Sequence, residues 1–251
     1  MKHSLHTVLT LLFVCASAWG ENVPWQNPQI NEINREPAHA HFIPYTNEAN
    51  ALKQQALPAA QRFAVNPATE RRISLDGTWK FLFSKNNEEC PTDFYKMGYN
   101  TKRWKDIQVP GSWELQGFDS PIYTDVAYPF PANPPHVPTD YNPVGAYVRE
   151  FTVPAHWKGM DIFLDFEGVE SAFYCWVNGE LAGYSEDSRL PAHFNITPFL
   201  KAGKNKLAVK VFRYSDGSYL GRIRITGNIA VLNAMYISMP VLKAVYKTSN
   251  W

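Results

Sequence analysis

The sequence has little net charge, little cysteine and few long hydrophobic runs. Its 251 residues carry 24 Lys and Arg against 23 Asp and Glu, a formal net charge of +1. Without a basic surplus to neutralise phosphates, nucleic acid and anionic membrane surfaces are poor candidate partners. The sequence has no apolar stretch long enough to span a bilayer as a helix, including the short apolar run near its N-terminus.

Proline, glycine and aromatic residues are abundant instead. The chain has 19 Pro, 14 Gly, 8 Trp and 13 Tyr, more than a helical bundle tolerates. We therefore expect an all-β fold of short strands joined by long turns.

The first twenty residues have the pattern of a secretory signal. A basic start, Met1-Lys2-His3, precedes the apolar run VLTLLFVC at 8–15, which is too short for a membrane span. Small residues predict cleavage after Ala18 or Gly20, so we expect a secreted or periplasmic protein. The alternative is lipidation of Cys15, although Val14 stands where a lipoprotein signal prefers a small residue.

The mature chain would keep two cysteines, Cys90 and Cys175. An exported pair could form a disulfide, but two lone cysteines in a chain of this size are more often buried thiols.

Residues 21–72 are expected to form an extended arm lying on another surface. The segment has six prolines and little hydrophobic periodicity, with a short Ala/Gln/Leu stretch at 49–62. His39 and His41 could be metal ligands, but without acidic or cysteine partners at ligand spacing they are better interpreted as surface histidines.

Strand patterns begin at Ile73. Alternating runs occupy 74–83, 146–153, 160–166, 172–177 and 206–214. Asn178-Gly179 separates the end of the run at 172–177 from a further segment at 180–184, which predicts a hairpin with a type I′ turn. Because no amphipathic helices intervene, we predict an antiparallel jelly-roll β-sandwich over 73–220.

A proline-rich segment, 110–143, interrupts these strands. Seven prolines from Pro121 to Pro143 exclude a regular strand there, so we expect a long ordered loop at one end of the sandwich, where such loops commonly carry function. Its side chains mix aromatic rings that can stack on sugar C–H groups with acceptors for hydroxyls, although the aromatics could equally pack the loop down. The aromatics are Trp113, Phe118, Tyr123, Tyr128, Phe130 and Tyr141, and the polar side chains are Asp119, Asp125, Asn133 and Asp140.

These segments also carry a resemblance to a known family. The chain resembles the N-terminal part of the large bacterial β-galactosidases of glycoside hydrolase family 2 over residues 24–220. The motifs are WQNP at 25–28, VPGSW at 109–113, SPIYTDVAYP at 120–129, NPPHVP at 133–138, FEGVESAF at 166–173, GYSEDSRLP at 183–191 and YSDGSYL at 214–220.

The resemblance implies a galactose-binding-domain-like jelly roll in a much longer retaining enzyme, whose TIM barrel holds the two catalytic glutamates. The resemblance also implies that full-length relatives use magnesium and sodium, and we expect those relatives to be homo-oligomeric. On this basis we expect the present chain to be truncated before the barrel, without a catalytic residue, cofactor or metal of its own. Glu186 and Asp187, in SEDSRLP, are then interpreted as part of a hairpin and charge network near Arg189.

One substrate contact can be carried over, at Asp125. In the family an amide side chain after the IYT motif contacts the galactosyl unit, so we expect Asp125 to bind substrate. Aspartate keeps an acceptor but lacks the amide's donor.

Three functions remain open for the chain. It could be the sugar-binding domain of a β-galactosidase, with a galactoside or galactose-containing glycan as ligand. It could instead be a free-standing carbohydrate-binding module, which would need an exposed aromatic platform, or an assembly domain that uses the arm.

The tail, 221–251, departs from the family pattern and is expected to be read out of frame. Codon junctions from Gly221 to Gly227 permit EDQDYW in another frame, which resembles the family's continuation after SDGSYL and would contain the acidic residue that contacts sugar and sodium. We expect this tail to leave one strand edge of the sandwich unpaired.

Overall fold

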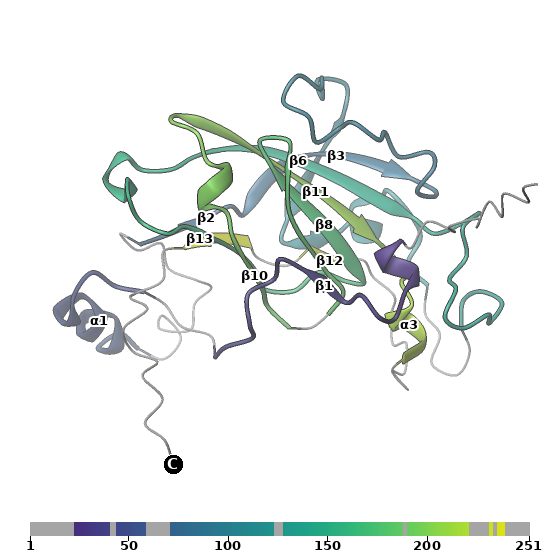
Figure 1. Ribbon diagram of the computed structural model, residues 1–251, viewed down its shortest axis with the longest axis horizontal. Coiled ribbons are helices and arrows are strands. Elements are labelled where there is room, and N and C mark those ends of the chain that lie inside the picture. Colours follow the sequence, from purple (N-terminus) through teal and green to yellow (C-terminus); the bar gives the residue numbers. More distant parts are fainter. Residues whose placement is uncertain are drawn as a thin grey trace, which may run out of the picture.

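The computed structural model describes residues 23–40, 44–58, 71–122, 128–187, 190–220, 231–232 and 235–238. In these residues two antiparallel sheets face each other as a sandwich (Figure 1). The predicted all-β jelly-roll class is confirmed. None of the described helices is long and apolar enough to cross a membrane.

The larger sheet is the backbone of the domain. Its nine-residue strands β6 and β11 pair along their whole length, from Val144 opposite Phe212 to Thr152 opposite Lys204. In order across the sheet the strands are β1 (Glu32–Ile33), β9 (Glu180–Ser185), β8 (Ala172–Val177), β11 (Lys204–Phe212), β6 (Val144–Thr152), β3 (Gly77–Ser84) and β4 (Lys105–Val109).

The smaller sheet covers the inner face of the larger one. It contains β10 (Ala192–Asn195), β7 (Phe163–Phe166), β13 (Met235–Ser238) and β2 (Arg72–Ser74) in that order. A short ladder joins β12 (Val231–Leu232) to β5 (Gly111–Ser112).

The prediction that the tail leaves a strand edge of the sandwich unpaired is wrong. Met235–Ser238 pairs with both β7 and β2, because any extended backbone can satisfy the hydrogen-bonding groups of a strand edge.

Large apolar side chains fill the space between the sheets. The strand alternation places Trp79, Phe81, Tyr147, Phe166 and Phe194 inside, each at most 1% exposed. Gly145 allows Trp113 to pack directly on the strand, because a Cβ there would lie 2.5 Å from the indole.

The predicted hairpin at Asn178-Gly179 is confirmed. Both residues have positive φ, 54° and 92°, as a type I′ turn requires. The Asn178 side chain donates to the Asn205 side chain at 2.7 Å and accepts from the Lys206 amide at 2.9 Å, which ties the hairpin to β11.

The N-terminal arm lies on the outer face and edge of the larger sheet (Figure 1). Trp25 is 5% exposed and stacks on Phe212 with ring centroids 4.9 Å apart, while β1 adds two residues to the edge of β9. The arm is not extended throughout, because Glu48–Gln55 forms the helix α1, which overlaps the start of the Ala/Gln/Leu stretch. The remaining short helices are η1 (Pro24–Gln26), η2 (Glu114–Gln116), η3 (Ala155–Trp157), η4 (Thr197–Phe199) and α3 (Gly217–Leu220).

Both cysteines are buried free thiols, as the sequence favoured. Burial raises the pKa of each thiol, which keeps it protonated and unreactive.

Candidate functional site

A cleft of about 570 Å³ opens between the proline-rich loop, the arm and the end of β11. This volume is in the range of small-molecule sites. Aromatic and polar side chains line it together, as expected for a site that binds sugar: Phe130, Tyr141 and Tyr214 among the first, and Gln26, Asn133, His136, Thr139 and Asp140 among the second.

The loop that forms most of the cleft is held in place at several points. It curls away from the sandwich at the right of Figure 1. The Tyr219 hydroxyl accepts from the amide of Asn133 and donates to the carbonyl of His136, both at 3.2 Å, and the Val137 side chain is buried. These contacts order a segment that its prolines exclude from the sheets.

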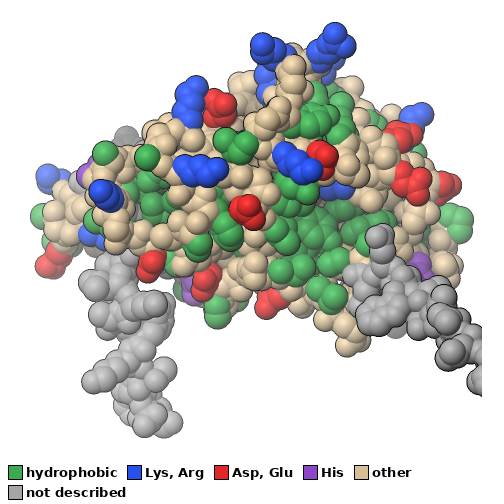
Figure 2. All heavy atoms as spheres, turned by 45° about the horizontal axis from the view of Figure 1, so that its top comes forward, with side chains coloured by type: hydrophobic (Ala, Val, Ile, Leu, Met, Phe, Trp, Pro, Cys, Tyr) green, Lys and Arg blue, Asp and Glu red, His purple; other side chains and the backbone are tan. Residues whose placement is uncertain are grey.

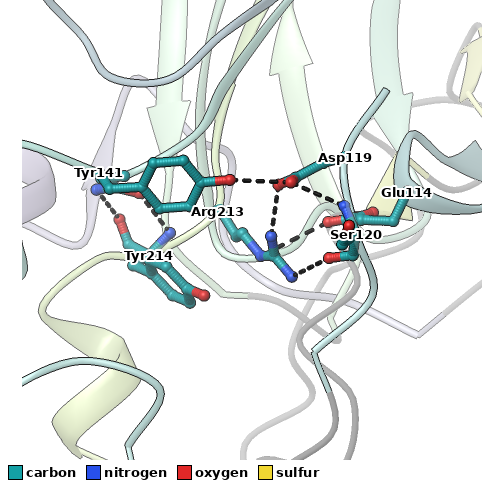
Figure 3. A network of polar contacts seen from close by, with 7 residues as sticks. Glu114, Asp119, Ser120, Tyr141, Arg213 and Tyr214 are labelled. Atoms are coloured by element: carbon teal, nitrogen blue, oxygen red, sulfur yellow. Dashed lines mark hydrogen bonds and ion pairs between the residues drawn. The ribbon is translucent and has the colours of Figure 1, made fainter. Parts of the chain in front are cut away.

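A buried arginine fastens the start of the loop to the strand end (Figure 3). Arg213, 2% exposed, follows β11 directly. Its guanidinium donates to the Asp119 carboxylate at 2.6 Å and lies 3.6 Å from the Glu114 carboxylate. A buried charge needs such pairing to offset its desolvation, so this network fixes the loop relative to the sandwich.

Tyr141 joins the same network from the far end of the loop. Its hydroxyl donates to the Asp119 carboxylate at 2.9 Å, and Figure 3 shows the ring held beside Arg213. Partial burial and the bond to Asp119 raise the pKa of Tyr141 to about 12. The hydroxyl thus stays a donor at any physiological pH.

A pair of carboxylates, Glu186 and Asp216, lies under the arm. Glu186 accepts from the Tyr184 hydroxyl at 2.8 Å and from the Gly217 amide at 2.7 Å. Burial, and then hydrogen bonding to Glu186, raises the pKa of Asp216 to about 8. Asp216 is 1% exposed, so the fold encloses this end of the pair. The charge network expected for Glu186 and Asp187 beside Arg189 stays a prediction, because Arg189 lies outside the described residues.

Among the described residues, no three His, Cys, Asp or Glu side chains gather where they could hold an ion. The magnesium and sodium that the family resemblance implies stay an expectation.

The arm histidine His39 is exposed and stacks on His193 at 4.2 Å. His193 is held by Asp165, with 2.5 Å between the ring nitrogen and the carboxylate. His39 thus has a packing role at the surface, while His41 lies outside the described residues.

The predicted sugar contact Asp125 lies outside the described residues, as do Tyr123 and Arg189. The described chain stops at Ile122 and resumes at Tyr128, and Ile122 lines the cleft.

The other loop residues divide between packing and the cleft. Trp113 is buried in the core and Phe118 packs against it, so for these two aromatics the packing interpretation is the right one. Tyr128, 38% exposed, stacks with Phe130. Asn133, Asp140 and Tyr141 line the cleft, while Asp119 supports it from the network.

Sequence reasoning missed Arg213 and Tyr214 as parts of the site. Arg213 is 94 residues from Asp119, and local periodicity gives no sign of such a pairing. The available signal was position, since Tyr214 begins the YSDGSYL motif and Arg213 directly precedes it.

Aromatic rings outside the loop stack on one another. On the outer face of the larger sheet Tyr95 lies parallel to Trp176, with centroids 4.8 Å apart, and Tyr174 stacks on the same indole at 5.7 Å. Rings stacked in this way cover one another's faces, whereas stacking on a sugar requires an uncovered face. Figure 2 shows hydrophobic side chains among charged ones on the face in view. The rings of the stack face one another, so they do not lie side by side as a flat platform.

Comparison with known families identifies the sandwich. Residues 73–229 match the family described as glycosyl hydrolases family 2, sugar binding domain. A β-galactosidase of Priestia megaterium is 44% identical over 198 residues, which are 77% of this chain and 18% of that protein. A β-galactosidase of Halalkalibacterium halodurans is 41% identical over 79% of this chain and 19% of its own length. The chain thus spans about a fifth of the length of these relatives.

Solved structures share the fold at lower identity. A β-glucuronidase from glycoside hydrolase family 2 superposes with a TM-score of 0.52 and 22% identity, covering 70% of this chain and 18% of that chain. A calcium-binding mutant of Bacteroides uniformis β-glucuronidase 2 gives a TM-score of 0.51 at 23% identity, covering 67% and 18% respectively. At this identity the likeness concerns the fold alone.

Proposed function

The chain belongs to glycosyl hydrolase family 2 through its sugar-binding domain, and we propose that it serves an exported β-galactosidase by contributing the loop end of the sandwich to a galactoside site. The observation that carries this proposal is the cleft in the proline-rich loop, which the Arg213 network holds in a fixed position. A preorganised loop binds with less loss of conformational entropy than a mobile one.

Asp125 is the proposed contact to the galactosyl unit. As a carboxylate it accepts hydrogen bonds from sugar hydroxyls, and it cannot donate one as an amide would. Asp125→Asn adds the donor and keeps the size of the side chain, whereas Asp125→Ala removes both functions.

The proposed location is outside the cytoplasm, secreted or periplasmic. The basic start and apolar run of the first twenty residues support it. Under this proposal the chain binds its sugar without a resident metal. Fractionation of expressing cells tests the location: recovery only with the cytoplasm contradicts it.

A glycan array probed with the purified chain tests the function. We expect binding to glycans with terminal β-galactose, which Asp125→Ala weakens and Asp125→Asn changes less. If neither substitution changes galactoside binding, Asp125 is not part of the site. Binding to no galactoside, with the chain folded, would contradict the function and leave assembly through the arm as the better account.

A further inference from the structure

Tyr141 combines an accessible ring with a fixed hydroxyl. The residue is 42% exposed and lines the cleft, yet its hydroxyl is bound to Asp119, which in turn is bound to Arg213. An exposed tyrosine that serves only solubility needs no such anchor. Here an ion pair that is almost fully buried holds the ring of a cleft residue in one orientation (Figure 3).

A fixed aromatic face suits a pyranose ring. Tyrosine offers a large contact area for apolar C–H groups, and a ring that is already oriented loses little entropy on binding. The hydroxyl is already used by Asp119, so the ring face is the part of Tyr141 left for a ligand.

The groups beside Tyr141 suit sugar hydroxyls. Asp140 and Asn133 are exposed on the cleft wall. The Asn86 side-chain amide donates to the backbone carbonyl of Asp140 at 3.2 Å, which holds this part of the loop. A carboxylate and an amide together accept from and donate to hydroxyl groups.

The charge of the lining selects among sugars. No Lys or Arg is among the described residues that line the cleft, and Asp140 contributes a negative charge. A uronic acid would meet repulsion from Asp140 without a compensating cation, whereas a neutral hexose would not.

We propose that Tyr141 is the stacking surface of a subsite for a neutral pyranoside, with Asp140 and Asn133 as its hydrogen-bonding groups and the Asp119–Arg213 pair as its positioning support. The subsite rests on the proposed sugar-binding function and adds to it a place, a stacking residue and a preference for uncharged sugars.

The test is titration of the full chain with methyl β-galactopyranoside and methyl β-glucuronide, by calorimetry and by NMR. We expect the galactoside to bind in the millimolar range and the glucuronide at least about tenfold more weakly, since a tenfold ratio corresponds to one unfavourable charge contact of modest size. NMR should give contacts between the Tyr141 ring protons and one face of the bound galactoside. Equal binding of the two sugars would overturn the proposed preference.

Variants separate the ring from its anchor. Tyr141→Ala should weaken galactoside binding about tenfold, and Tyr141→Phe, which keeps the ring and loses the bond to Asp119, about threefold. Tyr95→Ala, in the aromatic stack of the sheet face, is the matched control and should leave binding unchanged. Near-ultraviolet circular dichroism checks that each variant is folded. If a variant fails to fold, the NMR contacts between the Tyr141 ring and the galactoside in the unsubstituted chain test the subsite instead.

The outcomes distinguish the subsite from the function. If the unsubstituted chain binds the galactoside and Tyr141→Ala binds it equally well, the subsite is wrong and the function stands. If Tyr95→Ala abolishes binding, the site lies on the sheet face and the subsite is again wrong. If the folded chain binds neither sugar, both proposals fail.

Discussion

Arg213 is the residue on which the position of the loop depends most. Its side chain is 1% exposed and faces two carboxylates, Asp119 at 2.6 Å and Glu114 at 3.6 Å. We predict that Arg213→Met lowers the free energy of unfolding by about 3–5 kcal/mol, because it leaves buried negative charge without its cation. Urea denaturation measures this loss.

Lys204→Met is the matched control for that substitution. Lys204 also pairs with a carboxylate, that of Glu150 at 3.1 Å, but both side chains are more than half exposed. Its loss should cost at most about 1 kcal/mol. If the two substitutions cost the same, the Arg213 network is not what stabilises the loop.

Asp216 gives the chain a specific pH dependence. Its pKa is raised to about 8 in the folded protein and is near 4 when unfolded. The folded state therefore binds more protons between these values, and the contribution of Asp216 to stability falls as pH rises from about 4 to about 8. Asp216→Asn, which cannot ionise, should flatten the melting temperature across this window and raise it at pH 8.

The measurement is a series of thermal melts from pH 5 to pH 8. A change of 1 kcal/mol corresponds to about 2–4 °C for a chain of this size, so the difference is measurable. A variant whose melting temperature falls with pH as steeply as that of the unsubstituted chain would show that another group sets the dependence.

At the scale of the elements, β9 and the arm meet over Gly183. A Cβ at this position would lie 2.3 Å from the Phe194 ring and 2.5 Å from the Ile33 carbonyl. We predict that Gly183→Ala costs about 1–3 kcal/mol by overpacking and loosens β1, which hydrogen exchange at Ile33 would detect. Gly98→Ala, where nothing lies within 4 Å, should stay within about 0.5 kcal/mol. Unchanged exchange at Ile33 would contradict the close packing of the arm.

The long strands and the hairpin were predictable from the sequence. Strands β3, β6, β8 and β11 follow alternating apolar patterns, and Asn178-Gly179 has the residue types that its turn requires. Short strands were missed because so few residues carry the pattern: in β4 only Ile107 and Val109 are buried.

The sequence predicted neither the helix α1 nor the contacts of the site. The helix formed where an extended arm was expected, and its cap is local, because the Asn47 side chain accepts from the Asn50 backbone amide at 2.9 Å. The Arg213–Asp119 and Glu186–Gly217 contacts join residues 94 and 31 positions apart, and no local pattern specifies them. The loop itself was predictable, because prolines exclude the sheet wherever they are dense.

For the molecule as a whole we predict that the purified chain does not hydrolyse β-galactosides. Retaining hydrolysis needs two carboxyl groups about 5 Å apart on either side of the bond. Two carboxylate pairs among the described residues are already engaged. Glu186 and Asp216 lie against the arm, with Asp216 1% exposed, and Glu114 and Asp119 are paired with the buried Arg213. Release of nitrophenol from p-nitrophenyl β-galactoside by protein free of host enzyme would contradict this prediction.

An amide chemical-shift map of the chain titrated with methyl β-galactopyranoside shows whether sugar binds at the loop end of the sandwich. We predict shifts concentrated in residues 110–143 and 213–220, around the cleft that includes Tyr141 and Tyr214. Shifts centred on Trp176 and the outer face of the larger sheet, or no shifts at millimolar sugar, would show that this cleft does not bind the galactoside.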